Sequence, residues 1–377
     1  MGMILNLASI EAINYDIRII TDLFNTQNEF LNNHIINKRA FCIVDLNVSK
    51  LYKEKWENYF LHYNIQAYCY TVESSEKIKN ISTVTDFINF CFGLNISRKD
   101  SIICIGGGIV CDIGGFSASL IRRGTPCIKI PTTLIGIIDA SIGVKNGVNF
   151  SNIKNSIGGY SAPSVVFCDL FFLKTLSINQ IKFGLVEMIK IIALKDVDTW
   201  ELLKKNVHSF YEVKINDVVI ELIRRSILFM IEELRDNLYE QKLERIVDYG
   251  HEFGHQIEVI TEYQLSHGES VGIGMIISNI IARNNKLITG TAFDDFYTFY
   301  SQLNLPLWHK KLNADLLYES KDSIRRHKNG KVSLVSIRKI GQPIFIEDFN
   351  YADIQKAVMF LQESPSLTHP QSLNTLI

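Results

Sequence analysis

The sequence predicts an α/β N-terminal domain, residues 1–172, followed by an all-α C-terminal domain, residues 173–362. Up to about residue 170, short apolar runs rich in β-branched residues are separated by segments of helical length, which is typical of a parallel α/β unit. Beyond it, apolar residues recur three and four positions apart, the period of an amphipathic helix. A length of 377 residues with 47% hydrophobic composition is sufficient for two cores.

The strands that the pattern predicts most clearly are AFCIVDL, SIICIGGG, CIKIPTT and SVVFCDL. The helical period is clearest in IKFGLVEMIKIIAL, in VVIELIRRSILFMIEELRDNLYEQKLERIVDYGHEFGHQIEV and in GESVGIGMIISNIIARNN. Residues 363–377 contain two prolines and many small polar side chains, so we expect a loose tail there.

Composition excludes several classes of partner. A formal net charge of −1 gives no concentrated basic face, so we expect neither nucleic acid nor an anionic membrane as the main partner. Seven cysteines without a CxxC pair indicate buried, reduced thiols and a cytoplasmic location. The first twenty residues lack signal-peptide regions and no uncharged apolar run approaches about 18 residues, so we expect neither secretion nor membrane insertion.

A glycine-rich stretch, SIICIGGGIVCDIGGF, is the first candidate ligand site. Its glycines, Gly106–Gly108, follow a predicted strand and precede a predicted helix, where backbone amides and the helix N-terminus can approach a pyrophosphate. A tight structural turn is the alternative. Asp112 would lie in the first turns of that helix, either favouring its positive end or touching the ligand.

The following segment, residues 121–160, gathers charged and amide side chains around small residues. Cations and amides among glycines suit a polyanionic ligand, although a solvated loop with scattered charges is the alternative. The side chains concerned are Arg122, Arg123, Asp139, Lys145, Asn149, Lys154 and Asn155. Thr132 and Thr133 follow a predicted strand, where their hydroxyls either reach a ligand or make a turn.

Three histidines of the second half indicate a metal site. His251 and His255 are four apart and share a helix face, while a capping box from Ser266 to Glu269 places His267 in the first turn of the next helix. A catalytic metal commonly takes a carboxylate as a third ligand. The candidate is Glu187, on an otherwise apolar helix with Lys190 one turn later. Hydrogen-bonded core histidines are the alternative interpretation.

The motifs GGGxxxD, PTTL, DASxGxK, KN, GLxExxK, GHxFGH and HGE occur in this order between about residues 100 and 270. Together they are more specific than any one alone. The chain therefore resembles the 3-dehydroquinate synthase superfamily, the sugar phosphate cyclases. This resemblance implies an NAD-binding α/β domain, a helical domain binding Zn²⁺ or Co²⁺, an active site between them, a small sugar phosphate as substrate and a homodimer.

The resemblance also implies roles for single positions. The metal ligands would be Glu187, His251 and His267. The catalytic or substrate-contacting positions would be Asp139, Lys145, Asn155, Lys190, Arg123, Arg245, Asp248, His255 and His327, with Arg326 as the alternative register for His327. Arg123 would reach a substrate phosphate across the dimer. The cofactor-binding positions would be Asp45, Glu76, Lys79, Gly107, Gly108, Asp112, Thr132, Thr133, Lys145, Lys154 and Thr175.

Two positions bear on the substrate. In dehydroquinate synthases, a lysine and an asparagine lie near the substrate carboxylate, where this chain has Met230 and Asp248. The thioether of Met230 and the anion of Asp248 suit a substrate carboxylate poorly. The alternative is that Met230 serves only in helix packing. The segments around both residues resemble the sedoheptulose 7-phosphate cyclases. Two features depart from that group: GHEFGHQIE keeps Gly254 and His255, as dehydroquinate synthases do, and Glu252 stands where a threonine is common.

The expected activity is therefore a cyclase acting on sedoheptulose 7-phosphate, in which transient oxidation by NAD precedes phosphate elimination and aldol closure to a C7 cyclitol. Three alternatives remain open. They are a 3-dehydroquinate synthase, a metal-dependent polyol dehydrogenase that would leave net NADH, and a non-catalytic NAD-binding protein.

Overall fold

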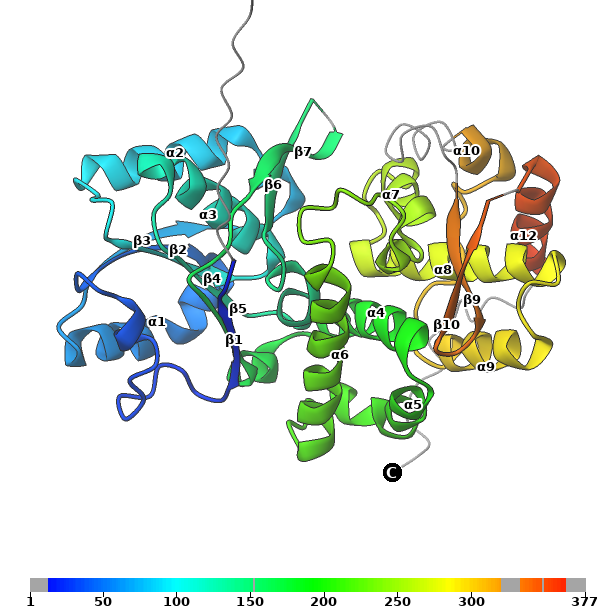
Figure 1. Ribbon diagram of the computed structural model, residues 1–377, viewed down its shortest axis with the longest axis horizontal. Coiled ribbons are helices and arrows are strands. Elements are labelled where there is room, and N and C mark those ends of the chain that lie inside the picture. The colour runs from blue at the N-terminus through cyan, green and yellow to red at the C-terminus, as the bar shows by residue number, and fades with distance from the viewer. Residues whose placement is uncertain (1–12, 152, 320–332, 348, 364–377) are drawn as a thin grey trace, which may run out of the picture. The chain divides into compact units, whose positions relative to one another are not determined.

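The computed structural model describes residues 13–151, 153–319, 333–347 and 349–363 (Figure 1). The chain divides into two compact units. The first unit comprises the chain up to Pro131 together with Gly143–Asp169, and the second comprises Thr132–Ile142 together with the chain from Leu170. The division expected after residue 172 falls just beyond Asp169. Apart from Glu363, the expected tail lies outside the described residues.

A six-stranded parallel sheet forms the centre of the first unit. The strand order is β1-β8-β5-β4-β2-β3. The bounds are β1 Asp16–Ile20, β2 Arg39–Asp45, β3 Gln66–Val72, β4 Ser101–Gly106, β5 Cys127–Pro131 and β8 Val165–Asp169. Every residue of β4, β5 and β8 is buried, which explains why these strands are mainly apolar without alternation, apart from the charged Lys129 in β5 and Asp169 at the end of β8.

Helices cover both faces of this sheet (Figure 1). These are α1 Leu46–His62, α2 Ile81–Gly93 and α3 Gly108–Leu120, with the short 3-10 helices η1 Asn32–His34, η2 Glu76–Ile78 and η3 Ile121–Arg123. Residues of α2 and α3 pack with Phe41 and Ile43 of β2 and Ile102 of β4 in one apolar core, and α1 lies on the opposite face. An antiparallel hairpin, β6 Lys145–Phe150 and β7 Ile153–Tyr160, completes the unit.

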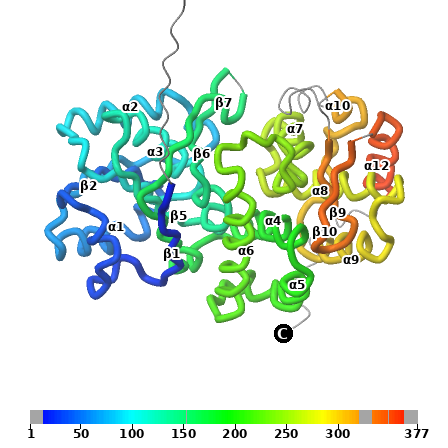
Figure 2. The backbone as a smooth tube through the Cα atoms, in the orientation of Figure 1, coloured from blue at the N-terminus to red at the C-terminus, as the bar shows by residue number. Residues whose placement is uncertain are grey.

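The second unit is mainly helical, as its trace in Figure 2 shows. Its helices are η4 Gly136–Ala140, η5 Leu170–Thr175, α4 Ile178–Lys195, α5 Val197–Tyr211, α6 Asp217–Arg235, η6 Ile246–Asp248, α7 His251–Ile260, α8 His267–Asn284, α9 Gly290–Ser301, α10 Ala314–Glu319 and α12 Tyr351–Glu363. The core of the unit is built on α4 and α8, whose residues are mostly buried. Within the described ranges, no helix is both long and apolar enough to cross a membrane.

Two features of the second unit differ from a purely helical expectation. The helical period of residues 218–259 is carried by two helices, because α6 ends at Arg235 and α7 begins only at His251. The chain enters α7 through Gly250 at φ 81°, where a Cβ would lie 2.4 Å from the carbonyl oxygen of Val271, so this reversal requires glycine. In addition, β9 Leu334–Lys339 and β10 Gln342–Ile346 form an antiparallel hairpin.

Candidate active site

A buried carboxylate and two imidazoles meet in the second unit. Glu187, in the middle of α4 and 1% exposed, places Oε1 3.6 Å from His251 Nε2 and 3.5 Å from His267 Nε2. Ligands at about 2.0–2.1 Å from a tetrahedral zinc ion stand roughly 3.3 Å apart. The donor set and its spacing therefore fit a divalent metal ion of the zinc type.

Local sequence explains how these side chains converge. The predicted capping box is present, since Ser266 Oγ accepts from the Glu269 amide and Glu269 accepts from the Ser266 amide, so α8 begins at His267. Helices α7 and α8 approach closely because Gly274 has no side chain. A Cβ there would lie 2.1 Å from the Gly250 carbonyl oxygen.

Lys190, one turn after Glu187, completes a charged core. Its Nζ lies 2.5 Å from Glu187 Oε2. Burial raises the pKa of Glu187, but Lys190 and the two imidazoles outweigh burial and hold the pKa well below its usual range. Burial likewise lowers the pKa of Lys190, yet Glu187 and then Asp139 raise it above its ordinary value. The pair is therefore a carboxylate and an ammonium.

The two imidazoles differ in their surroundings. Burial and the Lys190 charge lower the pKa of His251 well below its ordinary value, which favours the neutral, ligand-competent ring. Burial also lowers the pKa of His267, but the neighbouring carboxylates of Glu187 and Glu258 outweigh it and raise the pKa to about 9. His255 shares the face of α7, with its ring centroid 5.3 Å from that of His251 and 5.9 Å from that of His267.

Glu258 is a site residue that was not among those predicted from the sequence. Its Oε1 lies 2.9 Å from His267 Nδ1, and its side chain is buried. The signal was available, because Glu258 stands seven residues after His251 and three after His255 on the same helix face.

The predicted residues Asp139, Arg245 and Asp248 also belong to the second unit. Asp139 lies on η4, and both aspartates act electrostatically on Lys190. Arg245 Nη2 donates to Asp248 Oδ1 at 2.5 Å, and Arg245 Nη1 is also ion-paired with Glu240. One guanidinium therefore contacts two carboxylates.

In the first unit, a second polar network connects predicted cofactor and substrate positions. Lys79 Nζ lies 2.7 Å from Asp112 Oδ2 and donates to Asn155 Oδ1 at 2.6 Å. Asn149 Nδ2 donates to Glu76 Oε1 at 2.7 Å, and Lys154 Nζ lies 3.6 Å from the same oxygen. The network therefore ties η2 to the β6–β7 hairpin and to the first turns of α3.

Two of the predicted cofactor-binding residues lie at the start of α3. Gly107 is the N-cap and Gly108 the first residue of α3, directly after β4, so free amides lie at the carboxyl edge of a parallel sheet. This is where dinucleotide phosphates bind in such sheets. Asp45, at the end of β2, caps α1 by accepting from the amides of Asn47 and Val48.

The remaining predicted positions are placed individually. Thr132 is buried directly after β5. Thr133 Oγ1 accepts from the Gly136 amide at 3.2 Å, as expected for a threonine that makes a turn. Thr175 Oγ1 donates to the Phe172 carbonyl at 3.3 Å. Arg123 is exposed at φ 63°, and Lys145 is the exposed first residue of β6. His327 and its alternative Arg326 lie outside the described residues.

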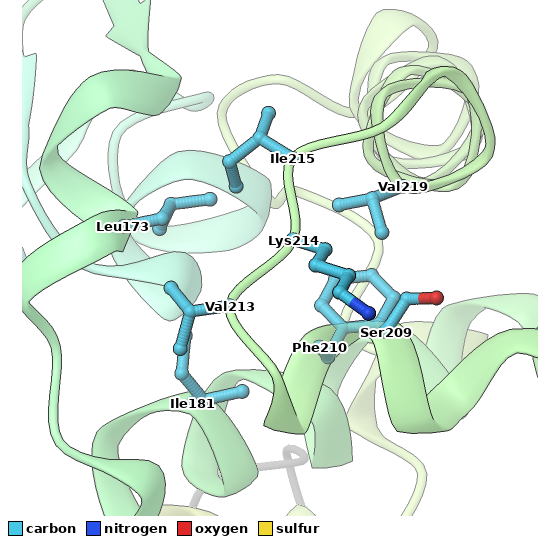
Figure 3. A pocket seen from close by; sticks show the side chains of 8 residues that line it. All are labelled: Leu173, Ile181, Ser209, Phe210, Val213, Lys214, Ile215 and Val219. Atoms are coloured by element: carbon cyan, nitrogen blue, oxygen red, sulfur yellow. The ribbon is translucent and has the colours of Figure 1, made fainter.

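A small apolar pocket elsewhere in the second unit contains none of these residues. Figure 3 shows that its side chains come from η5, α4, α5, α6 and the α5–α6 turn. The lining residues are Leu173, Ile181, Ser209, Phe210, Val213, Lys214, Ile215 and Val219. The pocket therefore takes no part in either polar cluster.

The fold and clusters are those of an NAD-dependent, metal-binding cyclase family, and comparison with known proteins agrees. The 3-dehydroquinate synthase N-terminal family matches residues 69–183, and the 3-dehydroquinate synthase C-terminal family matches residues 184–325. The chain belongs to the 3-dehydroquinate synthase superfamily of sugar phosphate cyclases.

Similar proteins carry more than one activity. A 2-epi-5-epi-valiolone synthase of Actinomyces sp. is 35% identical over 86% of this chain and 87% of its own. A 3-dehydroquinate synthase of Campylobacter jejuni strain RM1221 is 35% identical over 75% of this chain and 82% of its own. The structure of the 2-epi-5-epi-valiolone synthase of Streptomyces hygroscopicus subsp. jinggangensis 5008, with NAD⁺ and Zn²⁺ bound, superposes with a TM-score of 0.91. It is 30% identical and covers 95% of this chain and 99% of its own. Percentage identity alone does not separate these two activities.

Proposed function

We propose that this chain is an NAD- and divalent-metal-dependent cyclase that converts sedoheptulose 7-phosphate to a C7 cyclitol, 2-epi-5-epi-valiolone or a stereoisomer of it. The observation that carries the proposal is the cluster of Glu187, His251 and His267, with buried Lys190 beside it. The similarity to 2-epi-5-epi-valiolone synthases over most of the chain supports the same reaction class.

The metal ligands in this proposal are Glu187, His251 and His267. The α3 N-terminus, Asp112 and the network around Lys79 would hold NAD. When bound, NAD would oxidise a substrate hydroxyl to a ketone, and the reduced cofactor would later return the hydride. The metal ion would polarise the oxygens at the reacting carbons.

The chain's own residues orient the sugar. Lys190 is held as an ammonium by Glu187, so it can donate to a substrate oxygen but cannot accept a proton from it. Asp139, which acts electrostatically on Lys190, would accept from a substrate hydroxyl. Asn155 offers its amide NH₂ to the ligand, because Lys79 occupies its carbonyl oxygen. Arg123, Lys145 and His327 would face the phosphate, as the family resemblance implies.

Asp248 favours a substrate without a carboxylate. Asp248 stands where dehydroquinate synthases carry an asparagine, and its carboxylate would repel a substrate carboxylate at that end. Met230, 4% exposed on α6, supplies no cation there. A 3-dehydroquinate synthase is the second candidate, favoured by His255 and Gly254 in GHEFGHQIE.

The proposal is tested by product analysis. Purified protein given NAD, Zn²⁺ and sedoheptulose 7-phosphate should release phosphate and form a carbocycle identified by NMR, without net NADH. Accumulating NADH would indicate a polyol dehydrogenase instead, and protein that retains no metal and turns over no substrate would indicate a non-catalytic role.

The proposal includes a cytoplasmic homodimer. All seven cysteines are free thiols, which suits a reducing compartment. Arg123 is exposed, as a residue serving the partner's site would be in the separated chain. Light scattering after size-exclusion chromatography should give twice the chain mass of 43.1 kDa.

A further inference from the structure

The carboxylate of Glu258 contacts His267 on the ring edge opposite Glu187. Glu258 Oε1 lies 2.9 Å from His267 Nδ1, whereas Glu187 Oε1 lies 3.5 Å from His267 Nε2. Glu258 is 2% exposed, so water competes little for its oxygens. An ionised carboxylate only accepts hydrogen bonds. Nδ1 of His267 therefore carries the hydrogen and donates a hydrogen bond to Glu258.

This hydrogen bond determines which nitrogen can bind a metal. In a neutral imidazole only one nitrogen carries hydrogen, so a proton on Nδ1 leaves the lone pair on Nε2. Nε2 is the atom that faces Glu187 Oε1. A carboxylate on the far nitrogen also increases the basicity of the ring as a ligand and fixes its rotation.

His251 has no equivalent support among the residues that the structure describes. Its Nε2 faces Glu187 Oε1 at 3.6 Å, but its buried Nδ1 has no hydrogen-bond partner there. The two imidazoles therefore differ, because a second carboxylate accepts from the far nitrogen of His267 and none does so at His251 within the described ranges.

We propose that Glu258 is a positioning residue that pre-sets the Nδ1–H tautomer of His267 for metal binding. This inference rests on the metal site of the proposed function, but it does not depend on the substrate. His255, Glu258 and His267 also lie close enough to form a ligand group. However, the 2.9 Å contact is a hydrogen-bond distance, shorter than the roughly 3.3 Å between two ligands of one tetrahedral ion.

The test compares metal affinity in three variants of the full chain. Glu258→Ala removes the acceptor, Glu258→Gln keeps an acceptor oxygen without charge, and Glu252→Gln is the matched control. Glu252 is also a buried carboxylate of α7, but its Oε1 accepts from the Val335 amide of β9. After chelator treatment, Zn²⁺ and Co²⁺ affinities are measured by competition with a chromophoric chelator.

Glu258→Ala should bind metal about 10 to 100-fold more weakly, as loss of such outer partners typically does. Glu258→Gln should lie between Glu258→Ala and wild type, and Glu252→Gln should match wild type. Ring ¹⁵N NMR of the metal-free protein at a pH above about 9, where the His267 ring is neutral, should show the Nδ1–H tautomer at His267 in wild type and a tautomer mixture in Glu258→Ala. A purely structural role would change the unfolding midpoint without this tautomer change.

Three results would overturn the inference. In the first, folded Glu258→Ala binds metal as tightly as wild type. In the second, wild type binds two metal equivalents and Glu258→Ala loses one of them. In the third, wild type binds no metal. The second result would make Glu258 a ligand. If wild type binds one metal ion, Glu258→Ala weakens it and sedoheptulose 7-phosphate is not turned over, the inference stands and the proposed substrate is wrong.

Discussion

Lys190 and Glu187 form an ion pair in the interior of the second unit, with Nζ 2.5 Å from Oε2 and side chains 2% and 1% exposed. A buried pair of this kind costs desolvation, and removing one partner leaves an unpaired charge. Here the carboxylate also faces two imidazole nitrogens. Lys190 and a bound metal ion would therefore share Glu187 as their counter-ion. The Lys190 ammonium group would remain a hydrogen-bond donor next to the metal ion.

Replacing Lys190 by methionine separates these two roles. Turnover should fall about 10² to 10³-fold, because one pre-oriented donor is lost, whereas metal affinity should stay the same or increase, because a competing cation is gone. Steady-state kinetics and metal titration measure the two effects. The control is Lys195→Met at the end of α4, where the lysine pairs with Glu232 and Glu233. Loss of metal in Lys190→Met would contradict the assignment.

Each proposed ligand should be needed for metal retention. Glu187→Gln, His251→Ala and His267→Ala should purify without stoichiometric metal and without measurable turnover, as determined by inductively coupled plasma mass spectrometry and phosphate release. His208→Ala, in α5 and outside the cluster, is the control. A ligand variant that keeps both metal and the wild-type rate would show that its residue is not a ligand.

The first-unit network predicts a difference between two neighbouring lysines. Lys79 is buried and bonded to Asp112 and Asn155, whereas Lys77 is exposed. Charge-assisted hydrogen bonds contribute about 1.5–3 kcal/mol. Lys79→Ala should therefore weaken NAD binding about tenfold or more in isothermal titration calorimetry, and Lys77→Ala should leave it unchanged. Equal affinities in both variants would place NAD away from this network.

Substrate choice should respond to Met230 and Asp248 together. The double variant Met230→Lys, Asp248→Asn restores a cation and an amide, so the kcat/KM ratio for the carboxylated dehydroquinate precursor over sedoheptulose 7-phosphate should rise about tenfold, as expected for about 1.4 kcal/mol of regained attraction. Leu228→Lys with Asp248→Asn is the control, since Leu228 is exposed on the same helix. An unchanged ratio would mean that these side chains do not face the substrate.

The sequence predicted the features that depend on local order. Strands β2, β4, β5 and β8, the shared face of His251 and His255, the capping box before His267 and the turn from Glu187 to Lys190 all follow from short spacings. Each needs only a helical or strand period and one hydrogen-bond pattern.

What the sequence did not predict depends on contacts between distant segments. The bond from Lys79 to Asn155 joins residues 76 positions apart, and Asn155 takes a left-handed φ of 50° that no pattern specified. The contact between Glu258 and His267 requires α7 and α8 to approach through Gly250 and Gly274. The interruption after Arg235 was not predicted because the apolar period continues through it. A local contact follows there, in which Asn237 donates to the Lys242 carbonyl oxygen and accepts from the Lys242 amide.

Paired phosphate-release assays test the identity of the substrate most directly. Purified wild-type protein with NAD and Zn²⁺ receives sedoheptulose 7-phosphate in one assay and the carboxylated dehydroquinate precursor in the other. We expect phosphate release from sedoheptulose 7-phosphate alone, without net NADH. Release from the carboxylated sugar alone would contradict the account and identify a 3-dehydroquinate synthase.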